Sequence, residues 1–160
     1  MNSTHLLRRR LLLASAAAWL VSPASWAAPR KTLVEVWKDP NCGCCMDWVQ
    51  HLKDSGFEVR IHNTGNDAAR QRLGMPARFS SCHTALVDGY VLEGHVPARE
   101  ISRLLSTRPP ALGLAVPGMP VGSPGMDGPA YRGRRDAYDV LLVQKNGSAQ
   151  VFESYSKFTP

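Results

Sequence analysis

Three of the four cysteines in this 160-residue chain stand within four positions, in Cys42-Gly43-Cys44-Cys45. The residues before them, Leu33 to Trp37, alternate in the way that is typical of a β-strand. The residues after them, Cys44 to Ser55, repeat apolar side chains at helical spacing, and Gly56 is a natural helix terminator. Any fold for this chain must therefore place its cysteine cluster at a strand-to-helix junction.

The rest of the pattern also alternates between strands and helices. It predicts strands at 57–62, 84–87 and 90–92, and helices at 67–73 and 97–106. Asp88-Gly89 marks a tight hairpin between the last two strands, and Asn146-Gly147 marks a second one between 140–144 and 150–155. The order β-α-β-α-β-β-α is that of the thioredoxin fold. We therefore predict an α/β, thioredoxin-like domain with an added C-terminal β-hairpin.

Residues 109–130 form a segment rich in proline and glycine that also contains Met119 and Met126. Proline and glycine at this density predict a long loop without regular structure. Long loops inside a compact domain are often functional. We treat this loop as part of the single domain.

The N-terminus has the features of a secretory signal peptide. Arg8-Arg9-Arg10 precede an apolar run from Leu11 to Val21, and Ser25 and Ala27 form a small-x-small cleavage site. The apolar run is about half of the roughly 20 residues that span a bilayer. We predict that residues 1–27 are removed after Ala27, and that residues 28–160 form one domain in the periplasm without a membrane anchor. The charged residues are interspersed, so the formal net charge of +6 gives no support to nucleic-acid binding.

The chemistry of the cluster indicates soft metal ions. A helix N-terminus favours thiolate over thiol, and thiolates select Cu(I), zinc or iron–sulfur clusters. Cys82 lies just before the strand predicted at 84–87, whose start faces the first helix in a thioredoxin-like fold, and so adds a fourth thiolate. Cys44 and Cys45 diverge by about 100° on a helix, which disfavours a shared single ion. Bridging thiolates would let the four sulfurs hold more than one Cu(I).

Disulfides are the expected use of cysteines in an exported protein, but the spacing argues against them here. Cysteines this close in sequence rarely reach the separation of a relaxed disulfide, and the bond would close almost no loop. A structural disulfide framework is therefore not expected.

Three further side chains are candidate ligands. Met119 and Met126 offer thioethers that suit Cu(I) as ligands or as a lid, although methionine more commonly fills gaps in packing. His83 follows Cys82 and could add an imidazole, although neighbours on a strand point to opposite faces.

Other histidines and methionines are not expected in the site. His51 lies about 10 Å further along the helix than Cys44. His62 and His95 stand at the ends of elements and are expected in surface or hydrogen-bonding roles. Met46 is expected to pack in the first turn of the helix.

Long strings of this sequence resemble one protein family. These strings are Trp37-Lys38-Asp39-Pro40-Asn41-Cys42-Gly43-Cys44-Cys45, Ser81-Cys82-His83-Thr84-Ala85, Glu93-Gly94-His95-Val96-Pro97 and the segment from Val116 to Met126. The chain is similar in them to the small exported bacterial metal-binding proteins that include the copper-resistance protein CopG. The resemblance implies a thioredoxin-like fold, periplasmic residence, a role in copper handling, and metal ligation by the motif cysteines and Cys82.

The leading hypothesis is a periplasmic copper-binding protein for copper resistance or homeostasis. It would hold Cu(I) in a multinuclear, cysteine-bridged cluster, with Cu(I)/Cu(II) cycling as a further role and other periplasmic copper-handling proteins as partners. No general base or substrate pocket can be read from the sequence, so an enzymatic role stays open; if the protein is an enzyme, we expect a copper oxidoreductase.

Two alternatives remain. A periplasmic thiol-disulfide oxidoreductase would use Cys42 and Cys45, a C-x-x-C at a helix start. Such enzymes carry a cis-proline where this chain has Ser81-Cys82-His83-Thr84, and the extra cysteines would invite wrong disulfides. A structural zinc module is the third class, but its usual spacing pairs two distant C-x-x-C units.

Overall fold

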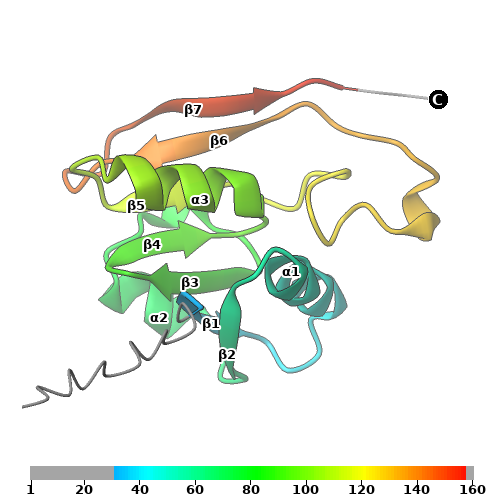
Figure 1. The fold of residues 1–160 in the computed structure, drawn as a ribbon, viewed down its shortest axis with the longest axis horizontal. Helices are drawn as coiled ribbons and strands as arrows, with labels where there is room; N and C mark the ends of the chain where they lie inside the picture. The colour runs from blue at the N-terminus through cyan, green and yellow to red at the C-terminus, as the bar shows by residue number, and fades with distance from the viewer. Residues whose placement is uncertain (1–30, 158–160) are drawn as a thin grey trace, which may run out of the picture.

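The computed structural model describes residues 31–157 (Figure 1). The predicted signal peptide and its cleavage site lie outside these described residues. The elements are β1 (Leu33–Lys38), α1 (Gly43–Asp54), β2 (Glu58–His62), α2 (Asp67–Arg72), the short 3-10 helix η1 (Ala77–Phe79), β3 (His83–Val87), β4 (Tyr90–Glu93), α3 (Ala98–Thr107), β5 (Gly113–Ala115), the 3-10 helix η2 (Pro129–Tyr131), β6 (Tyr138–Val143) and β7 (Ala149–Tyr155).

The strands form one seven-stranded sheet in the order β2-β1-β3-β4-β5-β6-β7. β1 runs parallel to β2, and β4 runs parallel to β5, while the other neighbours are antiparallel. From β1 to α3 the elements follow in the order that the sequence predicts. The prediction of a mixed α/β architecture with a C-terminal hairpin is confirmed.

The prediction that no regular element forms between 109 and 130 is wrong at β5. The three residues of β5 lie between Pro110 and Pro117, and since none of them is a proline, each has a backbone N–H for strand pairing. They pair with β4 on one side and with β6 on the other. A Cβ at Gly113 would collide with the Val91 carbonyl, so a glycine is required where this strand meets β4. β5 thereby joins the β6–β7 hairpin to the rest of the sheet.

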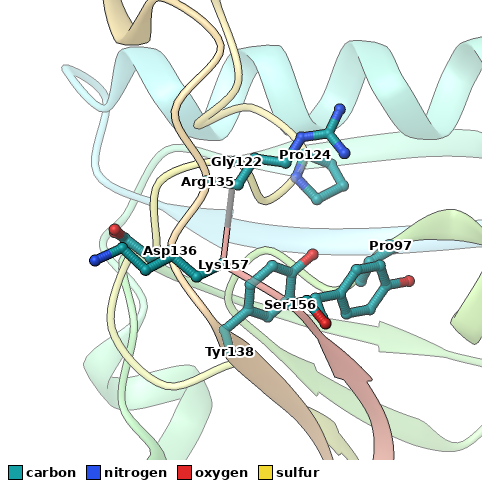
Figure 2. A pocket seen from close by; sticks show the side chains of 9 residues that line it. Pro97, Gly122, Pro124, Arg135, Asp136, Tyr138, Ser156 and Lys157 are labelled. Carbon is teal, nitrogen blue, oxygen red and sulfur yellow. The ribbon is translucent and has the colours of Figure 1, made fainter. Parts of the chain in front are cut away.

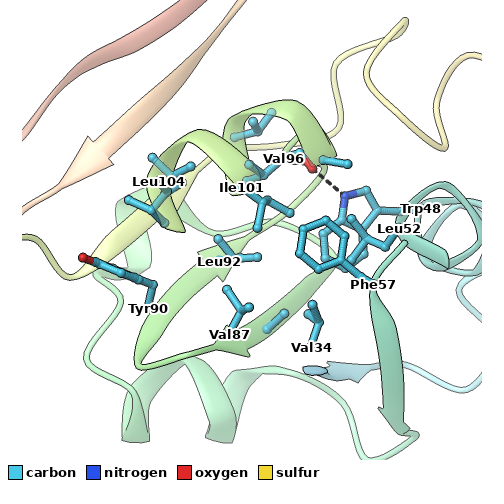
Figure 3. Packing of buried hydrophobic residues seen from close by; sticks show 14 of the residues in the cluster. Val34, Trp48, Leu52, Phe57, Val87, Tyr90, Leu92, Val96, Ile101 and Leu104 are labelled. Carbon is cyan, nitrogen blue, oxygen red and sulfur yellow. Dashed lines mark hydrogen bonds between the residues drawn. The ribbon is translucent and has the colours of Figure 1, made fainter. Parts of the chain in front are cut away.

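Helices α1 and α3 cover one face of the sheet (Figures 1 and 3). Their apolar side chains pack against those of β1, β3 and β4, and Trp48, Leu52, Ile101 and Leu104 are fully buried there. The indole N–H of Trp48 donates to the Val96 carbonyl at 2.8 Å, which ties α1 to the segment before α3. On the opposite face of the sheet, the buried side chains of Met75 and Phe79, which follow α2, pack against three strand residues: Val91, Ala115 and Val143.

Lys38 ends β1 with its side chain almost fully buried. Its Nζ donates to the carbonyl oxygen of Asp39 at 2.7 Å and lies 3.3 Å from the amide oxygen of Asn63. A buried ammonium requires such partners, and here they fix the turn that leads into Cys42. Among the helices of residues 31–157, none has the length and apolarity that a bilayer span requires.

Candidate metal centre

The four cysteines meet at one end of α1. Cys42, Cys44 and Cys45 belong to the start of the helix, and the antiparallel register that pairs Lys38 with His83 places Cys82 beside them. Their four sulfur atoms lie within 4.8 Å of one another. The sulfur of Cys44 is 3.6 Å from that of Cys42 and 3.9 Å from that of Cys82. The start of β3 therefore lies beside the cysteine motif, as the sequence predicts.

Cys42 and Cys45 are joined by a disulfide, whereas Cys44 and Cys82 are free thiols. The expectation that cysteines this close would not pair is therefore wrong for these two. The reason is the spacing: Cys42 is the extended residue before the helix, and three residues of the first turn bring the two Cα atoms to 5.4 Å. Binding by four thiolates requires this bond to be reduced first.

Two buried histidines stand against Cys82. Its sulfur lies 3.1 Å from Nε2 of His95 and 3.4 Å from Nδ1 of His83. The Cys82 sulfur and the two imidazoles form a second group that could hold a metal ion. Cys82 therefore belongs both to this group and to the group of four cysteines. His83, a predicted candidate, is thus beside the cysteines, and its ring packs on that of Trp48 with centroids 4.2 Å apart.

Of the surface or hydrogen-bonding role expected for His95, the surface part is wrong, because this side chain is fully buried. The expectation that it lies outside the site is also wrong, because its Nε2 lies beside the Cys82 sulfur. After β4 the chain turns back over the start of β3, where the Gly94 N–H donates to the His83 carbonyl at 2.9 Å. Gly94 has a φ of +72°, and a Cβ there would meet the Val116 carbonyl and Ser81. The signal available in the sequence was the string around Gly94-His95, between a strand and a proline-started helix.

His95 is oriented by the proline- and glycine-rich loop. Its Nδ1 lies 2.8 Å from the Pro124 carbonyl oxygen, which can only accept, so Nδ1 carries the proton. The lone pair of Nε2 then faces Cys82. A carbonyl partner of this kind fixes the tautomer of many metal-binding histidines. Burial lowers the pKa of His95 and of His83, so both rings are neutral and able to act as ligands.

Burial raises the pKa of the Cys82 thiol to about 12, with the nearby Cys44 as the second cause. Without metal, this sulfur therefore keeps its proton at neutral pH. A bound soft cation would have to displace that proton, because the thiolate is the metal ligand.

The two methionines of the loop lie in different surroundings. Met119 is 52% exposed and, with Cys82, lines a surface pocket of about 510 Å³. Met126 is buried, and the hydroxyl of Tyr131 donates to its sulfur at 3.4 Å. Met46 is exposed rather than packed in the first turn as expected.

The loop lies directly on the first turn of α1. A Cβ on Gly125 would stand 2.6 Å from the Cys44 carbonyl oxygen and 2.8 Å from the Trp48 nitrogen, and its φ is +85°. At its other end, the Gly118 N–H donates to the Ser80 carbonyl at 3.0 Å, and the Ser81 hydroxyl donates to the Gly118 carbonyl. A segment that follows the cysteines by about 40 to 80 positions in the sequence therefore packs against one side of their cluster, and Cys42, Cys44 and Cys82 stay partly exposed.

His51 and His62 lie away from the cluster, as predicted. Nε2 of His51 accepts the backbone N–H of Ala98 at 3.1 Å, so this ring joins α1 to α3. The His62 ring stacks on Trp37 with centroids 4.9 Å apart.

A buried carboxyl group supports the strand beside Cys82. Glu93 accepts the Ser81 N–H at 2.8 Å and the Thr84 hydroxyl at 2.6 Å, and Arg70 stands 3.6 Å away. Burial raises the pKa of Glu93 from 4.5 to about 7, although the two hydrogen bonds and Arg70 oppose the shift. Asp67, the other charged group at this site, adds to it.

Glu93 should make the stability of the fold depend on pH. Because the pKa is higher in the folded chain, the contribution of this group is complete below pH 4.5 and is lost as pH rises through 7. A separation of this size corresponds to about 3 kcal/mol. We expect Glu93→Gln to remove this loss, so that urea unfolding of the metal-free, reduced variant changes less between pH 5 and pH 8. Exposed Glu58 replaced by Gln serves as the control; parallel pH profiles for Glu93→Gln and the original chain would contradict the expectation.

Comparison with known proteins gives two kinds of match. A family model described as "Protein of unknown function, DUF411" matches residues 79–126, which contain Cys82, His83, His95 and both loop methionines. Two solved structures, titled "Copper resistance protein copG", Form 1 and Form 2, are each 44% identical to this chain. Each alignment covers 79% of this chain and 99% of the other, with TM-scores of 0.73 and 0.72. A search of curated proteins gives no match.

Proposed function

Because this chain belongs to the family of the CopG copper resistance proteins, we propose that it binds Cu(I) for copper resistance or homeostasis through its cysteine cluster. The observation that carries the proposal is the convergence of four sulfur atoms within 4.8 Å of one another. Thiolates and neutral imidazoles are donors that suit Cu(I), and hard ions prefer oxygen.

More than one copper ion fits this donor set better than a single ion does. Cys82 belongs both to the four-sulfur group and to the group that it forms with His83 and His95. A thiolate has lone pairs enough to bridge two soft cations, so Cys82 would join an all-sulfur site to a mixed sulfur–nitrogen site. Met119 and Met126 would serve as weaker thioether ligands or as a cover over the ions.

The disulfide supports a redox role beside binding. Reducing Cys42–Cys45 takes two electrons and two protons and yields two thiols, and the reverse reaction can reduce two Cu(II) to two Cu(I). The same observation favours the second candidate function, a thiol-disulfide oxidoreductase that uses Cys42 and Cys45. The Cys44 sulfur, 3.6 Å from that of Cys42, is placed to exchange with this bond.

The finer classification and the location are part of the proposal. The element order β-α-β-α-β-β-α supports a thioredoxin-like domain extended by β5 and the β6–β7 hairpin. The basic, apolar and small-residue segments of residues 1–27 support export with cleavage after Ala27, and the copper resistance relatives agree with a role outside the cytoplasm. Residues 28–160 would then act as one domain in the periplasm and exchange copper with other copper-handling proteins there.

An anaerobic Cu(I) titration of the reduced mature chain tests the proposal. Metal content and free thiols are counted at the endpoint. We expect more than one copper per chain with all four thiols protected. One ion or none, with Cys42 and Cys45 readily forming their disulfide, would instead support the oxidoreductase.

The double variant Met119→Ala, Met126→Ala should weaken Cu(I) retention while the domain stays folded. Loss of two thioether contacts is expected to lower the apparent affinity by roughly tenfold, about 1.4 kcal/mol. The measurement is the copper that remains on the protein beside a competing Cu(I) chelator. Met46→Ala, at an exposed position outside the loop, is the control. Retention equal to that of the control would assign both loop methionines to packing.

A further inference from the structure

Helix α1 is tied to the chain segment that carries His95 by two of its own side chains. The Trp48 indole N–H donates to the Val96 carbonyl at 2.8 Å (Figure 3). Nε2 of His51 accepts the backbone N–H of Ala98 at 3.1 Å. Val96 and Ala98 come shortly after His95 in the sequence. These two bonds therefore hold the His95 segment against the helix that carries the cysteines.

The bond from Ala98 meets a requirement of α3. Ala98 is the first residue of this helix, so its N–H has no carbonyl partner within the helix. The preceding residue, Pro97, makes no side-chain cap, and His51 supplies the partner from another helix. A helix concentrates positive charge at its N-terminus. This position therefore suits a neutral ring with a free lone pair and disfavours a protonated ring.

Open space adjoins the segment. Figure 2 shows Pro97 and Pro124 on the wall of a pocket between the start of α3, the proline- and glycine-rich loop and the β6–β7 hairpin. The pocket has a volume of about 510 Å³. Pro124 is also the residue whose carbonyl holds His95. The pocket therefore leaves room for the segment to shift when one of its bonds to α1 is lost.

Burial has the largest effect on the charge state of His51. It lowers the pKa of the ring below the ordinary value of 6.5, and Asp127 of the loop and Asp54 of α1 oppose that shift. In the first turn of α3, Arg99 and Glu100 pair with each other at 2.8 Å. The charged side chains on the elements around His51 are Asp47 and Asp54 of α1, Asp127 of the loop, and Arg99 and Glu100 of α3.

We propose that His51 is a positioning residue of the metal centre, and that protonation of its ring frees the segment that carries His95 from α1. A protonated ring has no lone pair for the Ala98 N–H. Because the pKa of His51 is lowered in the folded chain, the stabilisation is present above pH 6.5 and is lost as the pH falls through the lowered pKa. His51 acts on a metal ion only if the proposed copper function holds, whereas the tie itself depends on contacts of the metal-free chain.

His51→Ala and His51→Gln separate this role from packing. The amide oxygen of glutamine can take the place of Nε2 as an acceptor and does not titrate. The measurements are the hydrogen-exchange protection of the Ala98 amide and the ¹H signal of the His95 Nδ1–H, in the metal-free, reduced, ¹⁵N-labelled chain at pH 8 and at pH 5. His83, His95 and Glu93 titrate in every variant, so comparison at the same pH isolates His51.

At pH 8 we expect Ala98 protection to fall about two- to tenfold in His51→Ala, as one lost hydrogen bond predicts, and to persist in His51→Gln. At pH 5 the original chain should lose protection by a similar factor, while His51→Gln keeps it. The His95 signal should shift wherever Ala98 protection is lost. His62→Gln, on β2 away from the cluster, is the control and should behave like the original chain.

The same loss of Ala98 protection between pH 8 and pH 5 in the original chain and in His51→Gln would overturn the proposal. An unchanged His95 signal in His51→Ala would also overturn it, because the tie would then not reach the metal ligand. In loaded chains at pH 8, competition with a Cu(I) chelator should show weaker retention in His51→Ala and near-original retention in His51→Gln. If no chain, including the original, holds Cu(I), the proposed function fails, and the metal-free measurements still decide whether His51 positions His95.

Discussion

Replacing Cys82 with serine is expected to lower the copper content of the reduced chain by at least one ion. Cys82 immediately precedes β3, and it alone belongs to both donor groups. Serine has nearly the same size but offers a hard oxygen, which binds Cu(I) poorly. The four-sulfur group would lose one donor, and His83 and His95 would lose the sulfur that they share.

The measurement for Cys82→Ser is copper per chain after anaerobic loading and removal of loosely bound metal. Ser80→Ala, two positions earlier at an exposed site, is the matched control and should load like the original chain. Circular dichroism establishes that both variants are folded. Unchanged copper content in folded Cys82→Ser would rule out the four-thiolate centre. A change confined to the rate of thiol oxidation would support the oxidoreductase instead.

Replacing Gly125 with alanine is expected to destabilise the fold and loosen the metal centre together. At a φ of +85°, an L-residue costs about 1–2 kcal/mol, and the added Cβ would press on Cys44 and Trp48. Overpacking of that kind costs a further ~1–3 kcal/mol. The loop would have to move off α1, which would carry the Pro124 carbonyl away from His95.

Gly118→Ala separates the two effects. Gly118 lies in the same loop with a φ of +70°, but nothing stands within 4 Å of an added Cβ. It should therefore cost only the backbone strain, and it should retain copper like the original chain. Urea unfolding and competition with a Cu(I) chelator measure the two quantities. If both variants lose the same stability and retain the same copper, the contact of Gly125 with α1 has no part in holding the metal.

The sequence predicted what depends on local pattern. Alternation and helical spacing located β1 and α1, and with them the three clustered cysteines, while the strand after Cys82 indicated the fourth sulfur. The copper hypothesis rested on the chemistry of these ligands and on the family resemblance. Ligand chemistry and family resemblance both depend on which residues stand at which positions, and the sequence gives that information directly.

What could not be predicted depends on contacts between distant segments. His95 becomes a neighbour of Cys82 only because Gly94 turns the chain under Val116 and because the Pro124 carbonyl accepts a hydrogen bond from its Nδ1–H. β5 exists only because β4 and β6 supply partners on both sides, which its own three residues do not reveal. The disulfide depends on the backbone angles at Cys42, which the spacing alone leaves undetermined.

The packing of the loop against the cysteine cluster would affect how fast a bound metal ion is exchanged. The segment from Pro117 to Asp127 is fastened at Ser80, Ser81, His95 and Asp136 by single hydrogen bonds or pairs of them, and by the burial of Ser123 and Met126. We expect such a segment to detach while the sheet and its two covering helices stay intact, at a fraction of the free energy of global unfolding. The lifetime of a bound ion would then follow the amide hydrogen-exchange rates of this segment rather than the melting temperature of the domain. A stabilising substitution in the core could raise that temperature and leave the release of copper unchanged.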